Sequence, residues 1–352
     1  MSLNIVGRVQ MGAGQAAGFT SLPWAQQQFL RALGIDPYPG TLNLLVDPAS
    51  LADWQGLTVQ PGLRIEPGRA TDCGARCYPV LASVPGPGRI SITAAVLVPE
   101  VADYAPQRVE VLAAVSLREA LQLGDGDSVA LRTVPTRNQR AVLFDVDGTL
   151  VNSLDGYRLA AARAVQPFGW SVSREAVRHA LNTGEQFWDL VVPVELRGDP
   201  DLIARLRRDT MTHWPAVLDE SVQLYPGIGT MLARLRSAGV RLGICTASRG
   251  ESFRPLEQAG LMDCFEEIVT ARDVTSRKPD PEGLLLCMER MGVRPDETVY
   301  VGDSVADVQA SHAAGMYAIG VLTGAADSSL LSGAGAHRIL PDLQSLPDLL
   351  LT

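Results

Sequence analysis

Four carboxylates beyond residue 140 are the residues best suited to chemistry. Asp145 and Asp147 stand two positions apart on a glycine-bearing loop, and Asp303 and Asp307 follow a later apolar run. Carboxylates that converge on one place repel one another unless a cation holds them. Because oxygen ligands without histidine or cysteine favour Mg²⁺, we expect these four residues to form a magnesium site. A carboxylate beside Mg²⁺ can attack a phosphorus atom covalently.

Two more segments supply groups suited to a phosphate. Thr246 and Ala247 follow an apolar run, so a hydroxyl and neighbouring backbone amides can bond phosphate oxygens. Lys278 is the one lysine among 30 Lys and Arg residues. It offers a compact point charge where the planar fork of an arginine would crowd the site. The pattern predicts phosphoryl transfer, and the expected catalytic groups are Asp145, Asp147, Thr246 and Lys278.

The elements around these groups predict an α/β domain over residues 141–352. Apolar strands alternate with helical patterns, which is typical of a parallel sheet with helices on both faces. Ligands bind at the carboxyl ends of the strands in such sheets. The expected strands are residues 141–144, 240–245, 267–270, 298–301 and 317–321.

The stretch at 155–222 exceeds the roughly one dozen residues that a simple crossover needs. Its pattern is mostly helical, which predicts a cap inserted over the sheet edge. Arg178, Thr183 and Glu185 stand near a predicted helix break in this cap and are candidates for contacting the leaving group. The alternative is that they are helix-end residues and that nearby Trp188 belongs to an apolar core. The expected cap helices are residues 158–165, 173–181 and 201–212.

Each motif also has a purely structural explanation. Asp-x-Asp-Gly occurs in turns and calcium loops, and Thr246 could be an ordinary strand-end hydroxyl. Asp303 and Asp307 could cap the start of a helix, and Lys278 could lie in a plain turn. The order and spacing of all four motifs at predicted strand ends favour the functional interpretation.

In order and type, these segments resemble the four signature motifs of the haloacid dehalogenase-like hydrolase superfamily over about residues 141–325. The run Asp-Val-Asp-Gly-Thr-Leu-Val-Asn-Ser at 145–153, with Lys-Pro-Asp-Pro at 278–281, is similar to the phosphoglycolate phosphatase branch. The resemblance implies a Rossmann-like parallel-sheet core with an α-helical cap insert. It also implies a phosphoric monoester hydrolase that depends on Mg²⁺.

The same resemblance gives each residue a role. Asp145 is the expected nucleophile, which forms an aspartyl-phosphate, and Asp147 the general acid and then the general base. Asp145, Asp303 and the backbone carbonyl of Asp147 would hold Mg²⁺, while Asp307 would support the metal or the lysine. The expected phosphate-binding residues are Thr246, Ala247 and Lys278.

The pattern of residues 1–132 predicts a small, mostly β barrel. A polar linker at 133–140 is expected to join this barrel to the α/β domain. Glycine and proline turns separate short runs of β-forming residues, as in small barrels. An amphipathic helix is expected at 23–33. The β-forming runs are residues 5–9, 41–46, 89–98, 108–114 and 128–132.

The run Pro-Tyr-Pro-Gly-Thr-Leu-Asn at 37–43 and the glycine-dense segment at 7–19 resemble the archaeal-type CTP-dependent riboflavin kinases, a cradle-loop barrel family. The resemblance covers about residues 5–132 and implies CTP and a flavin as partners. Departures near residue 15 and across 98–104 leave two interpretations open: an active kinase, or a non-catalytic ligand-binding module. The residues it implicates are Gly12 and Gly14 in the nucleotide loop, Thr41 and Asn43 at Mg²⁺ and phosphates, and Glu110 as a base near the ribityl hydroxyl.

Composition narrows the remaining classes of function. A net charge of −9 argues against bulk electrostatic binding to nucleic acids or anionic membranes. No apolar run approaches the ~20 residues of a membrane helix. The first ten residues lack the pattern of a secretory signal, and five cysteines fit a reduced cytoplasm. The fusion suggests FMN or a ribityl phosphate precursor as substrate, whereas the phosphatase branch alone suggests 2-phosphoglycolate or a sugar phosphate.

Overall fold

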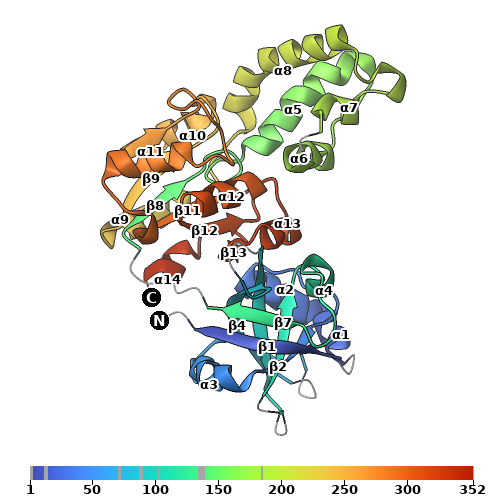
Figure 1. Ribbon diagram of the computed structural model, residues 1–352. Helices are drawn as coiled ribbons and strands as arrows, with labels where there is room; N and C mark the ends of the chain where they lie inside the picture. The colour runs from blue at the N-terminus through green and yellow to red at the C-terminus, as the bar shows by residue number, and fades with distance from the viewer. Residues whose placement is uncertain are drawn as a thin grey trace. The chain divides into compact units, whose positions relative to one another are not determined.

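The computed structural model describes residues 3–11, 15–69, 73–86, 90–101, 104–105, 107–133, 139–183 and 185–351. Its internal contacts divide the chain into two compact units (Figure 1). The first unit contains Met1–Arg137 and Asp327–Pro341, and the second contains Asn138–Ala326 and Asp342–Thr352. The first boundary falls within the expected linker, whereas residues 327–341, expected in the second domain, group with the first.

The first unit contains a closed antiparallel barrel, as the sequence predicts. The barrel strands are β1 (Asn4–Gln10), β2 (Leu42–Val46), β4 (Ala75–Ser83), β5 (Ser91–Pro99), β6 (Arg108–Ala113) and β7 (Ser128–Arg132). Their order is β4-β5-β6-β2-β1-β7, and β7 pairs back with β4 to close the barrel. A short strand β3 (Leu63–Ile65) pairs with the outer side of β4. Alternate residues of the strands, among them Val80, Val96 and Val111, form the core.

The sequence analysis missed β4 because a proline stands in its middle. Pro79 lies opposite Ala95 of β5, and proline cannot donate to a strand ladder, so it usually marks an edge or a loop. The helices of this unit are α1 (Gln15–Thr20), α2 (Pro23–Leu33), α3 (Leu51–Thr58) and α4 (Leu117–Ala120). The expected helix at 23–33 is confirmed by α2.

Residues 327–341 are bound to the barrel unit by buried hydrogen bonds. They contain α13 (Ser328–Gly333) and β13 (Arg338–Leu340). The Ser328 hydroxyl donates to the Gly34 carbonyl at 2.6 Å, and the Ser332 hydroxyl donates to the Thr93 carbonyl at 2.6 Å. The Thr93 hydroxyl in turn donates to the Ala336 carbonyl. Buried polar groups need such partners, so this segment completes the first unit.

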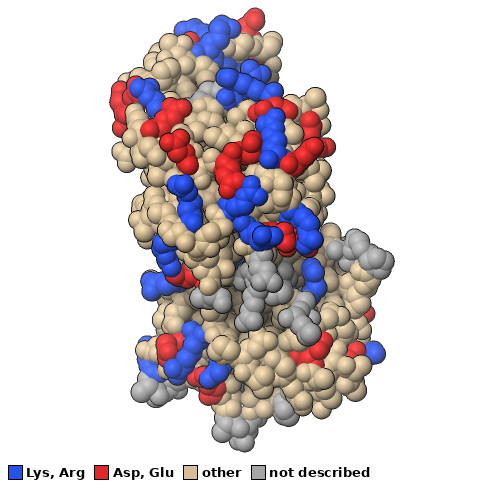
Figure 2. Space-filling model, turned by 90° about the vertical axis from the view of Figure 1, so that its left-hand side faces the viewer, with Lys and Arg blue, Asp and Glu red and all other residues tan. Residues whose placement is uncertain are grey.

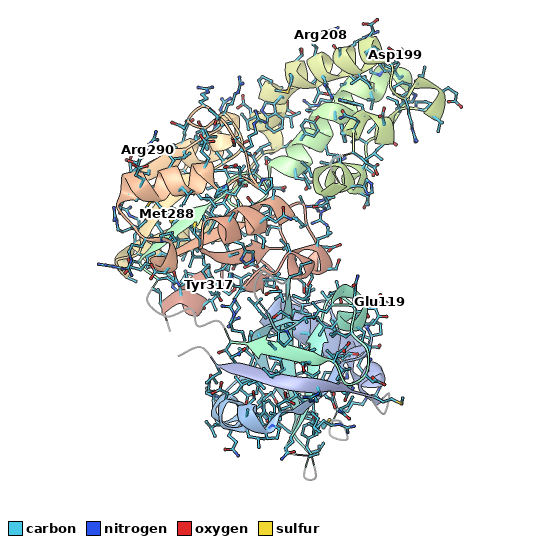
Figure 3. The ribbon with its side chains drawn as sticks, viewed as in Figure 1. Glu119, Asp199, Arg208, Met288, Arg290 and Tyr317 are labelled. Carbon is cyan, nitrogen blue, oxygen red and sulfur yellow. The ribbon has the colours of Figure 1, made fainter. Side chains whose placement is uncertain are left out.

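The second unit is built on a parallel sheet whose strands follow the sequence prediction closely. They are β8 (Ala141–Phe144), β9 (Arg241–Cys245), β10 (Glu267–Val269), β11 (Thr298–Gly302) and β12 (Tyr317–Val321). Their order is β10-β9-β8-β11-β12, with parallel pairing throughout. Helices cover the sheet, and Met288 of α11 packs in one apolar cluster with Leu143 and Cys245 (Figure 3). The helices around the sheet are α9 (Ile228–Ser237), α10 (Arg254–Gln258), α11 (Glu282–Met291), α12 (Val305–Ala313) and α14 (Leu346–Leu351).

A helical cap is inserted between β8 and β9, as expected. Figure 1 shows its helices as a group of their own beyond the layers around the sheet. Asp199 caps the start of α8 by accepting from the Asp201 and Leu202 amides (Figure 3). Trp188 is 2% exposed in the apolar core of the cap, which supports the structural explanation of this residue. The cap helices are α5 (Ser153–Val165), α6 (Arg174–Thr183), α7 (Phe187–Val191) and α8 (Pro200–Ser221).

Two features of the structure concern binding to membranes and nucleic acids: the character of the helices and the distribution of charge on the surface. None of the helices in the described part of the chain combines the length and apolar character needed to cross a membrane. Figure 2 shows acidic and basic side chains interspersed over the face that it presents.

Candidate active site

Asp145 and Lys278 form the centre of the site at the carboxyl end of the sheet. Asp145 follows β8 directly, and its backbone amide donates to the Val301 carbonyl of the neighbouring strand β11. Lys278 comes from the connection between β10 and α11, and its Nζ lies 2.7 Å from Asp145 Oδ1. The side chains of Lys278 and Asp145 are 10% and 8% exposed, respectively. The sheet therefore brings together two residues 133 positions apart, as the motif pattern predicted.

Tyr300 is a site residue that the sequence analysis missed. Its hydroxyl accepts from Lys278 Nζ at 2.8 Å and donates to the Cys245 carbonyl at 2.8 Å. Tyr300 is fully buried in β11. The available signal was a tyrosine between two valines in a buried strand, because a buried phenol usually needs a polar partner.

Asp307 serves both as a helix cap and as a partner of the lysine. Its Oδ2 accepts from the Ser304 amide and hydroxyl, which completes a capping box at the start of α12. Its Oδ1 lies 2.6 Å from Lys278 Nζ. The structural explanation offered for this residue is thus correct, and the same carboxylate also orients the ammonium.

Asp303 is held by the backbone and by two glycines. Its Oδ2 accepts from the Ala325 amide at 2.7 Å, and its Oδ1 accepts from the Thr149 hydroxyl at 3.2 Å. A Cβ at Gly148, where φ is +80°, would lie 2.5 Å from Asp303 Oδ2, and one at Gly324 would lie 1.9 Å from it. Glycine is required at both places for the carboxylate to fit.

The residues with the geometry of a metal site are Asp145, Asp303 and Asp307. One carboxylate oxygen from each lies within 4.8 Å of the other two, and all three side chains are buried. Hard oxygen donors gathered in this way fit Mg²⁺. The Asp147 side chain is not in this group; its Oδ1 accepts from the Ser252 hydroxyl instead. No sequence motif pointed to Ser252.

The carboxylates outnumber the cations in this buried place. Burial raises the pKa of Asp145, whereas Lys278 and Ser304 lower the pKa of Asp307 against the effect of burial. Burial, followed by the charge of Asp307, raises the pKa of Asp303 to about 7. Burial opposes the charge on Lys278, but Asp145 and Asp307 raise its pKa well above the usual range. The lysine is therefore protonated, and one ammonium faces three carboxylates. A divalent cation would remove the excess negative charge and lower the carboxyl pKa values.

Thr246 stands at the end of β9, where its backbone amide donates to the Val269 carbonyl. Its Oγ1 accepts from the Ser248 amide at 3.1 Å. Thr246 and Ala247 line the same cavity as Asp145 and Lys278. The expected phosphate-binding residues therefore share one cavity.

That cavity has a volume of about 610 Å³ and extends from the strand ends into the cap. Glu185 lines it, as expected of a residue that could contact a leaving group. Arg178 instead donates through Nε and Nη2 to the Gly324 carbonyl, at 2.9 and 2.7 Å. Asn182, on the same helix, donates to the Ala325 carbonyl at 2.9 Å. The Thr183 side chain lies outside the described residues.

In the first unit, three of the residues singled out from the sequence lie together. Asn43 of β2 pairs with Glu110 of β6 in the barrel register, and the Thr41 hydroxyl donates to Glu110 Oε2 at 3.3 Å. Burial raises the pKa of Glu110 against the effects of Thr41 and Arg108. Gly12 and Gly14 lie outside the described residues.

Two family models match the chain. The model of haloacid dehalogenase-like hydrolases matches residues 142–321. The model of CTP-dependent riboflavin kinases, described as a domain of unknown function, matches residues 9–133. Both resemblances predicted from the sequence are thereby confirmed.

Individual relatives cover about 59–60% of this chain. The phosphoglycolate phosphatase of Pseudomonas putida is 31% identical over 215 residues, which cover 59% of this chain and 78% of that protein. The phosphoglycolate phosphatase of Rhodospirillum rubrum is 32% identical over 219 residues, covering 59% and 90%. A solved structure from Bacteroides fragilis, described as a haloacid dehalogenase-like hydrolase, has a TM-score of 0.51 and 27% identity, and the match covers 59% of this chain and 99% of that one. A structure from Thermotoga maritima, described as a beta-phosphoglucomutase, has a TM-score of 0.51 and 26% identity, and covers 60% and 98%.

Proposed function

The chain belongs to the haloacid dehalogenase-like hydrolase family, and we propose that it is a Mg²⁺-dependent phosphatase that acts on a small phosphate monoester. The observation that carries the proposal is the buried group of Asp145, Asp303 and Asp307 with Lys278 among them. Such an arrangement accommodates a metal ion and a phosphate dianion together.

In the proposed reaction, a carboxylate oxygen of Asp145 attacks the phosphorus and the ester oxygen departs. Asp147 donates a proton to that oxygen, so the alcohol leaves neutral and an aspartyl-phosphate remains. Asp147 then accepts a proton from water, which attacks the phosphorus and releases phosphate and free Asp145. Ser252, which donates to Asp147, keeps that carboxylate apart from the metal group.

Mg²⁺ would be held by Asp145, Asp303 and the backbone carbonyl of Asp147. When bound, it supplies positive charge to the phosphoryl oxygens. Both oxygens of Asp307 already accept hydrogen bonds from Lys278 and Ser304, so we assign it to orienting the lysine. Lys278 offsets the charge of Asp145 and of the phosphate, and Thr246 with Ala247 binds the phosphoryl oxygens.

Asp145→Asn tests this proposal, since it removes the nucleophile while keeping the shape of the side chain. We expect phosphate release to fall by at least about a thousandfold, with the melting temperature retained. Addition of EDTA should stop the wild-type enzyme, and Mg²⁺ should restore it. The screen should contain FMN, ribityl phosphates, 2-phosphoglycolate and sugar phosphates. Undiminished turnover by the Asp145→Asn enzyme would refute the mechanism.

A second candidate function concerns the barrel, where Glu110 meets Thr41 and Asn43. A half-buried carboxylate with a raised pKa beside a hydroxyl suits a general base at a flavin hydroxyl, with CTP as phosphate donor. The test is FMN formation by the full chain with riboflavin, CTP and Mg²⁺, compared with Glu110→Gln. The full chain is needed because residues 327–341 complete the barrel unit. Flavin binding without FMN formation would identify a non-catalytic binding module instead.

All five cysteines are free thiols. Thiols persist in reducing compartments, and we therefore propose that the enzyme acts in the cytoplasm.

A further inference from the structure

The cap side of the active-site cavity is apolar and aromatic. Tyr157 of α5, Phe187 of α7 and Trp214 of α8 line it, and the Tyr157 and Phe187 rings meet edge to face with their centroids 5.4 Å apart. Leu181 and Met211 line it as well. Four cap helices thus contribute large apolar side chains to the wall that faces the catalytic carboxylates.

Two of these side chains are unusually exposed for their type. Leu181 is 58% exposed and Met211 is 55% exposed. Apolar surface left open to water in a cavity is favourable to cover. A bulky apolar leaving group would cover both side chains.

The charges around the cavity also favour an uncharged leaving group. Among the described residues that line it, Lys278 is the one cation, and its ammonium is taken up by Asp145 and Asp307 at the phosphate end. The charged side chain that the cap contributes to the lining is Glu185, which is 58% exposed and whose carboxylate lies 3.3 Å from His179 Nε2. Arg178 lies on the same helix as Leu181, but its Nε and Nη2 donate to the Gly324 carbonyl. A leaving group with a carboxylate, such as that of 2-phosphoglycolate, would meet no cation beyond Lys278 among the described lining residues.

The volume of the cavity also favours a large leaving group. A cavity of about 610 Å³ lies in the middle of the range of about 300–1,000 Å³ that holds drug-sized ligands. A two-carbon acid would leave most of it to water.

We infer that the substrate is the phosphate monoester of an alcohol with a bulky, uncharged, aromatic body, and that the cap discriminates against small carboxylated phosphates. This inference rests on the proposed phosphatase function. Flavin mononucleotide has this chemistry, with an uncharged ring system at the end of a phosphorylated chain. Its ring system would stack on the aromatic wall while its phosphate occupies the metal end.

The test compares three esters: 4-phenylbutyl phosphate, butyl phosphate and 2-phosphoglycolate. The first two have alcohols of similar acidity, so the ratio of their kcat/KM values isolates the contribution of the ring. We expect phenylbutyl phosphate to exceed butyl phosphate by about tenfold to a hundredfold, as one buried ring predicts, and 2-phosphoglycolate to be the poorest. Equal values for the first two, or 2-phosphoglycolate as the best substrate, would overturn the inference and leave the phosphatase assignment intact. If no ester is hydrolysed in an Asp145-dependent way, the proposed function itself fails.

Variants locate the effect in the cap. Trp214→Ala should lower the phenylbutyl-to-butyl ratio by about tenfold. Trp170→Ala is the matched control, because this tryptophan stacks on Phe168 elsewhere in the cap and should leave the ratio unchanged. If Trp214→Ala fails to fold, Met211→Ser at a half-exposed position should lower the ratio in the same direction. Leu181→Arg adds a cation and should make 2-phosphoglycolate a better substrate relative to butyl phosphate; no change in either ratio would count against the inference.

Discussion

Replacing Lys278 with arginine keeps the charge at the centre of the site but should cost most of the activity. The Lys278 ammonium makes three contacts of 2.6–2.8 Å, to Asp145 Oδ1, Tyr300 Oη and Asp307 Oδ1. An ammonium has three N–H donors arranged around a point, so each acceptor is satisfied. A guanidinium is larger and planar, with donors in a fixed fork. It cannot reach all three acceptors in the same volume.

The magnitude follows from these contacts. One buried acceptor left without a donor costs about 1–3 kcal/mol, and forcing a larger group into a packed place costs about 1–3 kcal/mol more. The minimum of about 2 kcal/mol, if expressed in the transition state, is roughly a 30-fold loss of kcat/KM. Removing the charge with Lys278→Met should be worse, because it leaves buried carboxylates unpaired at about 3–5 kcal/mol.

The assay is Mg²⁺-dependent phosphate release from the best substrate of the screen, with the melting temperature measured in parallel. Arg277→Lys is the matched control, since Arg277 is the neighbour of Lys278 in the same motif, and it should behave as the wild type. A Lys278→Arg enzyme within about threefold of the wild type, which corresponds to less than about 1 kcal/mol, would refute the reasoning. It would mean that charge alone, rather than the shape of the cation, is what the site requires.

Two more substitutions test the packing around the two units. Gly324→Ala places a Cβ 1.9 Å from Asp303 Oδ2, so the Mg²⁺ concentration for half-maximal activity should rise by about tenfold to a hundredfold, whereas Gly333→Ala, where the Cβ meets open space, should leave it unchanged. Ser332→Ala leaves the buried Thr93 carbonyl without its hydroxyl donor and should lower the free energy of unfolding by about 1–2 kcal/mol in denaturant titration. Ser329→Ala, which removes only a bond to the exposed Asp327, should stay within about 0.5 kcal/mol.

The catalytic residues could be read from the sequence because a parallel sheet forces strand ends to one edge. Once β8, β9 and β11 are recognised, Asp145, Thr246 and Asp303 must lie close together, whatever the details of packing. Lys278 was the harder residue, since it lies in a loop. It was identified because it is the one lysine among 30 Lys and Arg residues. The structure places its Nζ 2.7 Å from Asp145.

What the sequence could not provide depends on contacts between distant segments. The barrel strand β4 was missed because local rules weigh Pro79 against a strand, while its ladder with β5 outweighs that preference. In α8 the expected helix ended at residue 212 ahead of Pro215, yet the helix continues to Ser221. Packing of Leu206, Thr210 and Val217 in the buried part of the helix outweighs the lost backbone bond.

The grouping of residues 327–341 with the barrel has the same origin. The alternation of strands and helices continues through this segment, so periodicity assigns it to the α/β domain. Two of its hydroxyl groups nevertheless have buried carbonyl partners near the barrel helices and strands, since Ser328 bonds Gly34 and Ser332 bonds Thr93. A serine carries no sequence signal for a partner that lies in a distant part of the chain.

The cap residue Arg178 links the cap to the loop that holds Asp303. The sequence suggested that it contacts the leaving group, but its guanidinium bonds the Gly324 carbonyl, and Asn182 bonds the next carbonyl. The amide of that same Ala325 donates to Asp303. The peptide between Gly324 and Ala325 therefore bonds Asp303 through its amide and Arg178 through its carbonyl. We therefore expect a substitution that removes these bonds, such as Arg178→Ala, to weaken the hold of this peptide on Asp303 and to raise the Mg²⁺ concentration needed for half-maximal activity.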